Sequence, residues 1–133
     1  MSEAQDYQDD LTIVNDAELW RRIPNTRIIV DDDSGERRPS SQAFNDDDDG
    51  DPMSVYLAEV VLLANRSPES LLESFVGYGL AAITAGHARE CQQGVFRAPT
   101  ADEPAHAKVF GKKTKKVRRA LAVEARWVLS PPP

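Results

Sequence analysis

The sequence predicts one α+β domain, built on a mixed or antiparallel sheet with two longer helices on one face. The chain has 133 residues, which suits one hydrophobic core because domains most often hold about 100 to 150 residues. Strand-like segments come first, a helix and more strands follow, and a helix comes last, an order typical of α+β domains. We expect residues 11–129 to form this domain, between a disordered acidic tail at residues 1–10 and a proline tail at residues 130–133.

The first half of the chain favours strands. Residues 26–30, TRIIV, are rich in β-branched side chains, and the DDDSG that follows is typical of a turn, so we expect a hairpin with residues 36–44. Residues 53–57, MSVYL, place their methionine, valine and leucine on one face. Residues 17–23, AELWRRI, fit a helix or a strand, and residues 58–66, AEVVLLANR, fit a strand extension or a short helix.

Two longer helices are expected in the second half. Ser67-Pro68-Glu69 suits a helix start, because serine caps, proline fits the first turn and glutamate faces the positive end of the helix dipole. This helix would run through PESLLESFVGY and end at a glycine. Residues 113–129 carry apolar side chains at helical spacing and predict the last helix. Between the two helices, LAAIT, GVFRA and HAKVF are candidate strands, and AGHARECQ is a candidate short helix.

Charge is distributed unevenly along the chain. The net charge is −6, with −10 in residues 1–51 and +4 in residues 52–133. Residues 108–126 hold eight Lys or Arg side chains against one acid. The negative total argues against generic coating of nucleic acid, whereas the local basic run favours an anion site.

The composition predicts a cytoplasmic protein with no membrane partner. The first residues, MSEAQDYQDD, lack the basic and apolar regions of a signal peptide. The longest apolar run, VVLLA, is far shorter than the about 18 residues of a membrane span. The chain has one cysteine, Cys91, which cannot form an internal disulfide.

An exposed acidic loop is expected at residues 45–52. The run from Asn45 to Gly50 matches the start of a calcium loop, in which alternate oxygens converge on the ion. The twelfth position, however, is Tyr56 rather than the glutamate that closes such a loop. A hydrated acidic turn is therefore favoured over a metal site, and no metal or cofactor is predicted.

Ser41, His106 and Arg38 are the candidate catalytic residues. In this hypothesis Arg38 steadies a phosphate, Ser41 orients or attacks a nucleotide or nucleic-acid substrate, and His106 is the general base. Their spacing matches no nucleophile motif such as G-x-S-x-G. The alternative, which these residue types favour, is that Ser40 and Ser41 bond backbone groups next to an edge strand.

The basic run before the last helix is the candidate binding site. Its residues are Lys112, Lys113, Lys115, Lys116 and Arg119. Lysines at a helix N-terminus are unfavourable unless an anion compensates, and the acidic loops at residues 31–33 and 46–49 are candidates within the chain. We therefore expect a binding or regulatory protein that engages a protein partner or a phosphate-bearing ligand here. A small enzyme and a merely hydrated basic face are the alternatives.

Three short motifs resemble a pattern shared by small uncharacterised bacterial proteins. The pattern reads R-x-S-S-x-A-F at residues 38–44, S-V at residues 54–55 and P-A-H-A-x-V at residues 104–109. The resemblance extends from about Trp20 to Trp127 and implies no activity, cofactor or catalytic assignment. It implies that the first motif and His106 belong to one constellation. The acidic insertion after the first motif is unusual for the pattern.

Overall fold

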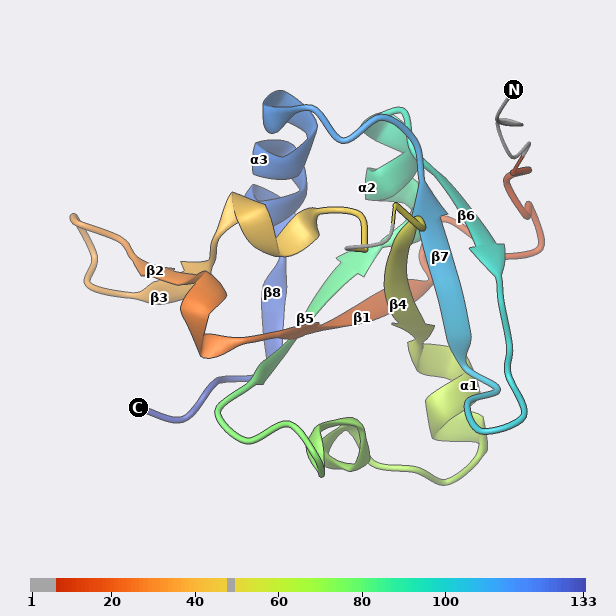
Figure 1. The fold of residues 1–133 in the computed structure, drawn as a ribbon, viewed down its shortest axis with the longest axis horizontal. Coiled ribbons are helices and arrows are strands. Elements are labelled where there is room, and N and C mark those ends of the chain that lie inside the picture. The colour runs from red at the N-terminus through yellow and green to blue at the C-terminus, as the bar shows by residue number, and fades with distance from the viewer. Residues whose placement is uncertain (1–6, 48–49) are drawn as a thin grey trace.

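Among residues 7–47 and 50–133, which the computed structural model describes, the main feature is a six-stranded sheet (Figure 1). The strand order is β6-β7-β4-β1-β5-β8, and every neighbouring pair is antiparallel. In chain order the strands are β1 (Glu18–Ile23), β4 (Met53–Leu57), β5 (Gly79–Thr84), β6 (Gly94–Arg97), β7 (His106–Phe110) and β8 (Arg126–Leu129). The α+β class and the antiparallel sheet predicted from the sequence are confirmed.

The larger apolar core lies on the face of the sheet covered by α2 (Ala85–Glu90) and α3 (Lys115–Glu124). Leu19 points into this core from the central strand β1 and is fully buried. Phe44, also fully buried, enters it from the 3-10 helix η2 (Ser41–Phe44), which packs against α3. The core therefore joins the sheet, α3 and the segment just before the acidic loop.

A second core lies on the opposite face, under α1 (Ala58–Leu63) and the 3-10 helix η3 (Pro68–Leu72). Trp20 and Tyr56 point to this face, because alternate residues of a strand lie on opposite sides. Val61 of α1 packs against them and is fully buried. The segment AEVVLLANR is thus a short helix at its start, and helices cover both faces of the sheet (Figure 1).

The prediction of a long helix from Ser67 onward is wrong, because only one short 3-10 helix forms in this segment. The Ser67 side chain makes no capping hydrogen bond, and only η3 forms. A regular helix would place Leu72 and Val76 on one face, yet Val76 is 95% exposed. Phe75 instead lies under the guanidinium of Arg22, whose carbon is 3.8 Å from the ring centroid. Contacts with the sheet override the local helical pattern here.

The last helix, α3, is shorter than the predicted residues 113–129. The Thr114 side chain caps it by accepting a hydrogen bond from the backbone N–H of Val117. The helix ends at Glu124, and the chain then enters β8, which pairs with β5. Trp127 lies in this strand, whose residues Trp127, Val128 and Leu129 suit a β-strand. The strand forms one edge of the sheet. One long helix is therefore present among the described residues where two were expected.

The hairpin predicted in the first half is present as a separate two-stranded sheet. It pairs β2 (Ile28–Val30) with β3 (Arg37–Pro39) in antiparallel register. Its second strand is shorter than predicted because Ser40 caps η2, accepting a hydrogen bond from the backbone N–H of Gln42. This contact bears out the expected hydroxyl-to-backbone bonding for Ser40.

The segments at both ends contact the domain. Of the predicted acidic tail, residues 1–6 lie outside the described part of the chain. Asp9 forms an ion pair with Arg89, with 2.9 Å between Oδ2 and Nε. At the other end, Pro131 is buried and its carbonyl accepts a hydrogen bond from Arg37 at 2.6 Å.

Replacing Phe44 by alanine tests the larger core. Because Phe44 is fully buried, Phe44→Ala should lower the free energy of unfolding by about 3 to 5 kcal/mol. Val123→Ala is the control, because Val123 is 73% exposed, and its effect should stay within about 0.5 kcal/mol. Urea unfolding measures both. Equal losses from the two variants would contradict the assigned core.

Candidate functional site

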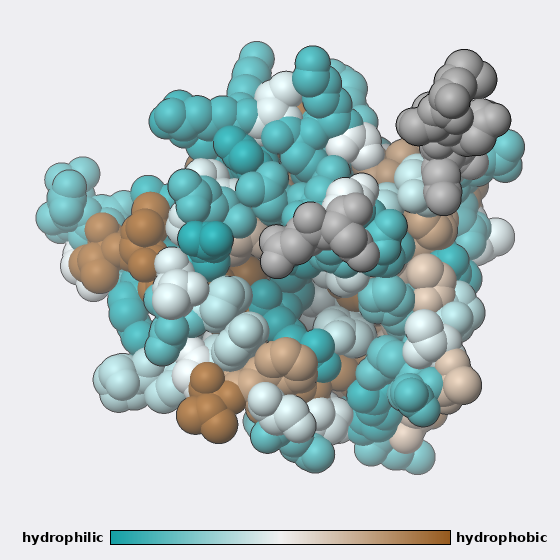
Figure 2. All heavy atoms as spheres, viewed as in Figure 1, coloured by the Kyte–Doolittle hydropathy of each residue, from teal (hydrophilic) through white to brown (hydrophobic). Residues whose placement is uncertain are grey.

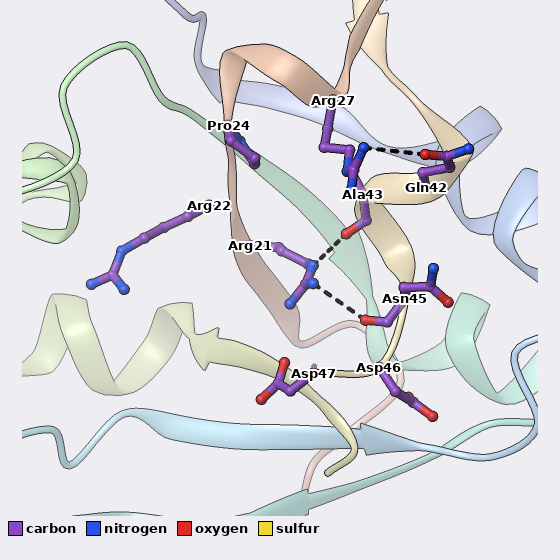
Figure 3. A pocket seen from close by; sticks show the side chains of 9 residues that line it. All are labelled: Arg21, Arg22, Pro24, Arg27, Gln42, Ala43, Asn45, Asp46 and Asp47. Atoms are coloured by element: carbon purple, nitrogen blue, oxygen red, sulfur yellow. Dashed lines mark hydrogen bonds between the residues drawn. The ribbon is translucent and has the colours of Figure 1, made fainter. Parts of the chain in front are cut away.

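Arg21 occupies the place where β1 and β4 stop pairing. The ladder between these strands ends at Trp20 opposite Tyr56. Arg21 then takes the place of the ladder with its side chain. Its Nη1 donates to the carbonyl of Ser54 at 2.6 Å. Its Nε donates to the carbonyl of Ala43, also at 2.6 Å (Figure 3). One guanidinium thus ties β1 to β4 and to the end of η2.

The Arg21 guanidinium is held by backbone dipoles rather than by a direct ion pair. Its third hydrogen bond, from Nη2, ends on the carbonyl of Asn45 at 3.3 Å. Burial lowers the pKa of Arg21, while the charges of Asp47 and Asp46 raise it from a greater distance. Within the described residues, no carboxylate oxygen lies within 4.0 Å of its nitrogens. Because arginine stays protonated, its positive charge has no counter-ion in contact within residues 7–47 and 50–133.

Asp46 and Asp47 fasten the acidic loop to two lysines. Asp47 Oδ2 lies 2.9 Å from Lys108 Nζ on β7 and also accepts a hydrogen bond from the Ser54 hydroxyl at 2.7 Å. Asp46 Oδ1 lies 2.8 Å from Lys113 Nζ. These two carboxylates are therefore ion-paired with the domain, where the sequence suggested a hydrated turn. Residues 48–49 of the same loop lie outside the described part of the chain.

Lys113 points inward, unlike the other members of the basic run. Its side chain is 3% exposed, and its ammonium also donates to the carbonyls of Val109 and Gly111, at 2.9 and 3.4 Å. Burial lowers the pKa of Lys113, and the hydrogen bond and charge of Asp46 oppose that change. Lys113 is thus a structural contact of the acidic loop, with Asp46 as the compensating anion.

The other four residues of the basic run are exposed to solvent. We call them the basic face of α3, counting with the helix the residue Lys112 just before its cap: Lys112, Lys115, Lys116 and Arg119. Among the described residues none of them forms an ion pair. Figure 2 shows hydrophilic residues gathered over the end of the molecule where Figure 1 places α3. This side of the domain therefore carries several positive charges that have no ion-pair partner in the described part of the chain.

A groove of about 460 Å³ lies between the end of α2 and the start of α3. Its lining includes Glu90, Cys91, Lys112, Thr114, Lys116, Val117 and Ala120. Burial, followed by nearby acidic charges, raises the pKa of the Cys91 thiol, so the thiol stays neutral and packs as a small apolar group. His87 Nε2 lies 2.9 Å from the carbonyl of Ala120 and links the two helices beside the groove. The groove thus combines apolar side chains with lysines.

The three candidate catalytic residues make separate contacts. Arg38, on the β2–β3 hairpin, pairs with Asp31 at 3.9 Å. His106 begins β7, and its Nδ1 lies 3.0 Å from the carbonyl of Ala98. Ser41 begins η2, beside α3. No hydrogen bond or ion pair recorded for the described part of the chain joins any two of these three side chains.

A hollow of about 380 Å³ borders Arg21 (Figure 3). Its polar lining includes Arg21, Arg27, Gln42, Asn45, Asp46 and Asp47. Neither Arg21 nor Arg27 was a candidate in the sequence analysis. The available signal was an arginine at an inward position of the strand ELWRRI, where Leu19 and Ile23 share its face.

Comparisons with protein-family models, with curated proteins and with solved structures find no match to this chain. In the part of the chain that the structure describes, no helix is long and apolar enough to cross a membrane. The same residues contain no group of three or more His, Cys, Asp or Glu side chains placed to hold a metal ion.

The Asp47 contacts predict a pH-dependent contribution to stability. Burial raises the pKa of Asp47, but the hydrogen bonds from Ser54 and Lys108 outweigh it and keep the value below the ordinary 3.8. A carboxyl whose pKa is lowered by folding stabilises the protein above its unfolded pKa, and this contribution disappears as the pH falls through the folded value. Asp47→Asn should therefore lose stability at neutral pH and show a flatter decline below about pH 4.

Urea unfolding at a series of pH values measures this effect. Asp33→Asn is the matched control, because it removes the same charge from an exposed turn of the β2–β3 hairpin. The control should keep the wild-type pH profile. If Asp47→Asn also kept it, Asp47 would not anchor the loop.

Proposed function

We propose that this is a binding protein that engages an acidic segment of a protein partner through the basic face of α3. The observation that carries the proposal is the group of four exposed cations without ion-pair partners among the described residues, next to a partly apolar groove. The single cysteine, Cys91, is a free thiol, which supports the cytoplasm as the place where this binding occurs.

The distribution of ion pairs supports this choice of surface. Asp46 pairs with Lys113 and Asp31 with Arg38, so these carboxylates are engaged away from the basic face of α3. The chain as a whole has a net charge of −6, which repels acidic partners at long range. A local positive field of this kind acts within about 8 to 10 Å in ordinary buffers. An acidic partner would therefore bind at the basic face of α3 and be repelled by the rest of the protein surface.

The groove beside the basic face favours a peptide over a purely electrostatic contact. Val117 and Ala120 offer apolar surface, and Lys112 and Lys116 stand beside them. An extended or helical segment with alternating acidic and apolar residues could place one set of side chains on each part of this surface. The buried centre would then supply affinity and the charged rim would supply orientation.

The enzymatic alternative stays a prediction. It requires proton transfer between Ser41 and His106, for which the two groups must lie within about 2.6 to 3.2 Å or share one water. His106 Nδ1 lies beside the carbonyl of Ala98, and among the described residues no hydrogen bond joins His106 to Ser41. No observation favours this alternative over binding at α3.

Reversing one charge on the basic face tests the proposal. A fluorescent peptide of alternating glutamate and leucine should bind the protein, and Lys116→Glu should weaken that binding by about tenfold, because an attraction becomes a repulsion. Fluorescence anisotropy at several salt concentrations measures the dissociation constant. The salt dependence should also become shallower in the variant.

Arg38→Glu is the control, because it makes the same change of charge on the exposed hairpin. It should leave the affinity within about twofold of the wild type. Failure of the wild-type protein to bind the peptide, or equal effects of the two variants, would count against the proposal.

A further inference from the structure

We propose that the hollow beside Arg21 is a second binding site, which takes a small ligand carrying a phosphate or carboxylate group together with hydroxyl or amine groups. The hollow has a volume of about 380 Å³, within the about 300 to 1,000 Å³ typical of small-molecule sites. Figure 3 shows the guanidinium groups of Arg21 and Arg27 on one side and Asp46 and Asp47 on the other. This division of charge sets the class of ligand.

Arg21 keeps donors available for an anion. A guanidinium has five N–H groups. The three nitrogens of Arg21 each donate to one backbone carbonyl, which leaves two N–H groups without an acceptor among the described residues. The three bonds hold the guanidinium at a fixed place beside the end of the β1–β4 ladder. A ligand anion would therefore meet an arginine that is already ordered, and this lowers the entropic cost of binding.

Arg27 and Gln42 add donors at the rim. Arg27 Nη1 donates to Gln42 Oε1 at 3.2 Å, so the amide nitrogen of Gln42 is turned to other acceptors. Asn45 is oriented in the same way, because its Oδ1 accepts a hydrogen bond from Arg118 at 3.2 Å. Both amides thus offer N–H groups, and Arg27 offers its remaining guanidinium donors.

Arg22 also lines the hollow, but its charge lies elsewhere. As the next residue of β1 it points to the opposite face of the sheet, where its Nε donates to the carbonyl of Leu71 at 2.7 Å. Its guanidinium lies over the rings of Phe75 and Tyr56. Figure 3 shows it extending away from Arg21 and Arg27. Of the three arginines in the described lining, Arg21 and Arg27 therefore face the proposed ligand.

The carboxylates opposite do not cancel these two charges. Lys113 pairs with Asp46 and Lys108 with Asp47, so each acid already has a cation in contact. Arg21 and Arg27, by contrast, have no ion-pair partner among the described residues. An anionic group between the two arginines would supply the missing negative charge through charge-assisted hydrogen bonds. Hydroxyl or amine groups of the same ligand could donate to the free oxygens of Asp46 and Asp47.

This site goes beyond the proposed function, because none of the four residues of the basic face of α3 lines the hollow. The two proposals therefore fail or succeed separately. Nuclear magnetic resonance of the nitrogen-15-labelled protein tests the second. The probes are glycerol 3-phosphate, glycerate, inorganic phosphate and glycerol, each titrated into the millimolar range.

Glycerol 3-phosphate or glycerate should shift the Arg21 Nε–Hε and Gln42 side-chain signals in a saturable way. Tighter binding of glycerol 3-phosphate would identify phosphate as the preferred anion, and tighter binding of glycerate would identify carboxylate. Inorganic phosphate should bind more weakly, and glycerol should have no effect. An absence of saturable shifts with every anion, an equal response to glycerol, or shifts confined to Lys112 and Lys116 would overturn the proposal.

Arg27→Gln should weaken the binding of the better probe by about tenfold, through loss of a charge-assisted contact at the rim. Arg27 is exposed, and within the described residues its side chain bonds only to Gln42, so this variant should remain folded. Arg97→Gln removes the same charge from an exposed position at the end of β6, away from the hollow, and is the control, which should bind as the wild type does. Equal affinities of all three proteins would refute the site.

Discussion

The structure depends on how it accommodates three inward-pointing cations on or beside the sheet: Arg21, Lys108 and Lys113. Removing a charge from water costs several kcal/mol unless partners replace the lost hydration. Here the partners are two carboxylates of one acidic loop and a set of backbone carbonyls. The loop, β4, β7 and the start of α3 are thereby joined into one network, and the path of the loop follows from it.

This network also decides which surfaces remain available for binding. Because Asp46 engages Lys113, the four other residues of the basic run keep their charges exposed on α3. Because Asp47 engages Lys108, the hollow beside Arg21 is lined by acids that already have counter-ions. Both proposed sites thus depend on the same pairing, although they lie on different residues and are proposed for different classes of ligand.

Sequence reasoning found those features that depend on local pattern. The alternation in MSVYL placed Met53 and Val55 on one face, as observed, because strand periodicity needs no knowledge of neighbours. It failed where contacts with residues distant in the sequence determine the conformation or burial of a residue. Leu129 is in a strand because β5 offers an unpaired edge, and Lys113 is buried because Asp46 lies beside it, and neither partner is near in sequence. Spacing alone could not separate Lys113 from Lys112 or Lys116, so the sequence could not show which of these lysines is buried.

A double-mutant cycle on Asp46 and Lys113 tests this account most directly. The free energy of unfolding would be measured for Asp46→Asn, for Lys113→Met and for the two together. If the pair holds the loop to the domain, the double variant should lose less stability than the two single losses combined, with a coupling energy of about 1 to 3 kcal/mol. Additive losses would mean that the two groups do not interact, and the network would no longer explain the course of the acidic loop.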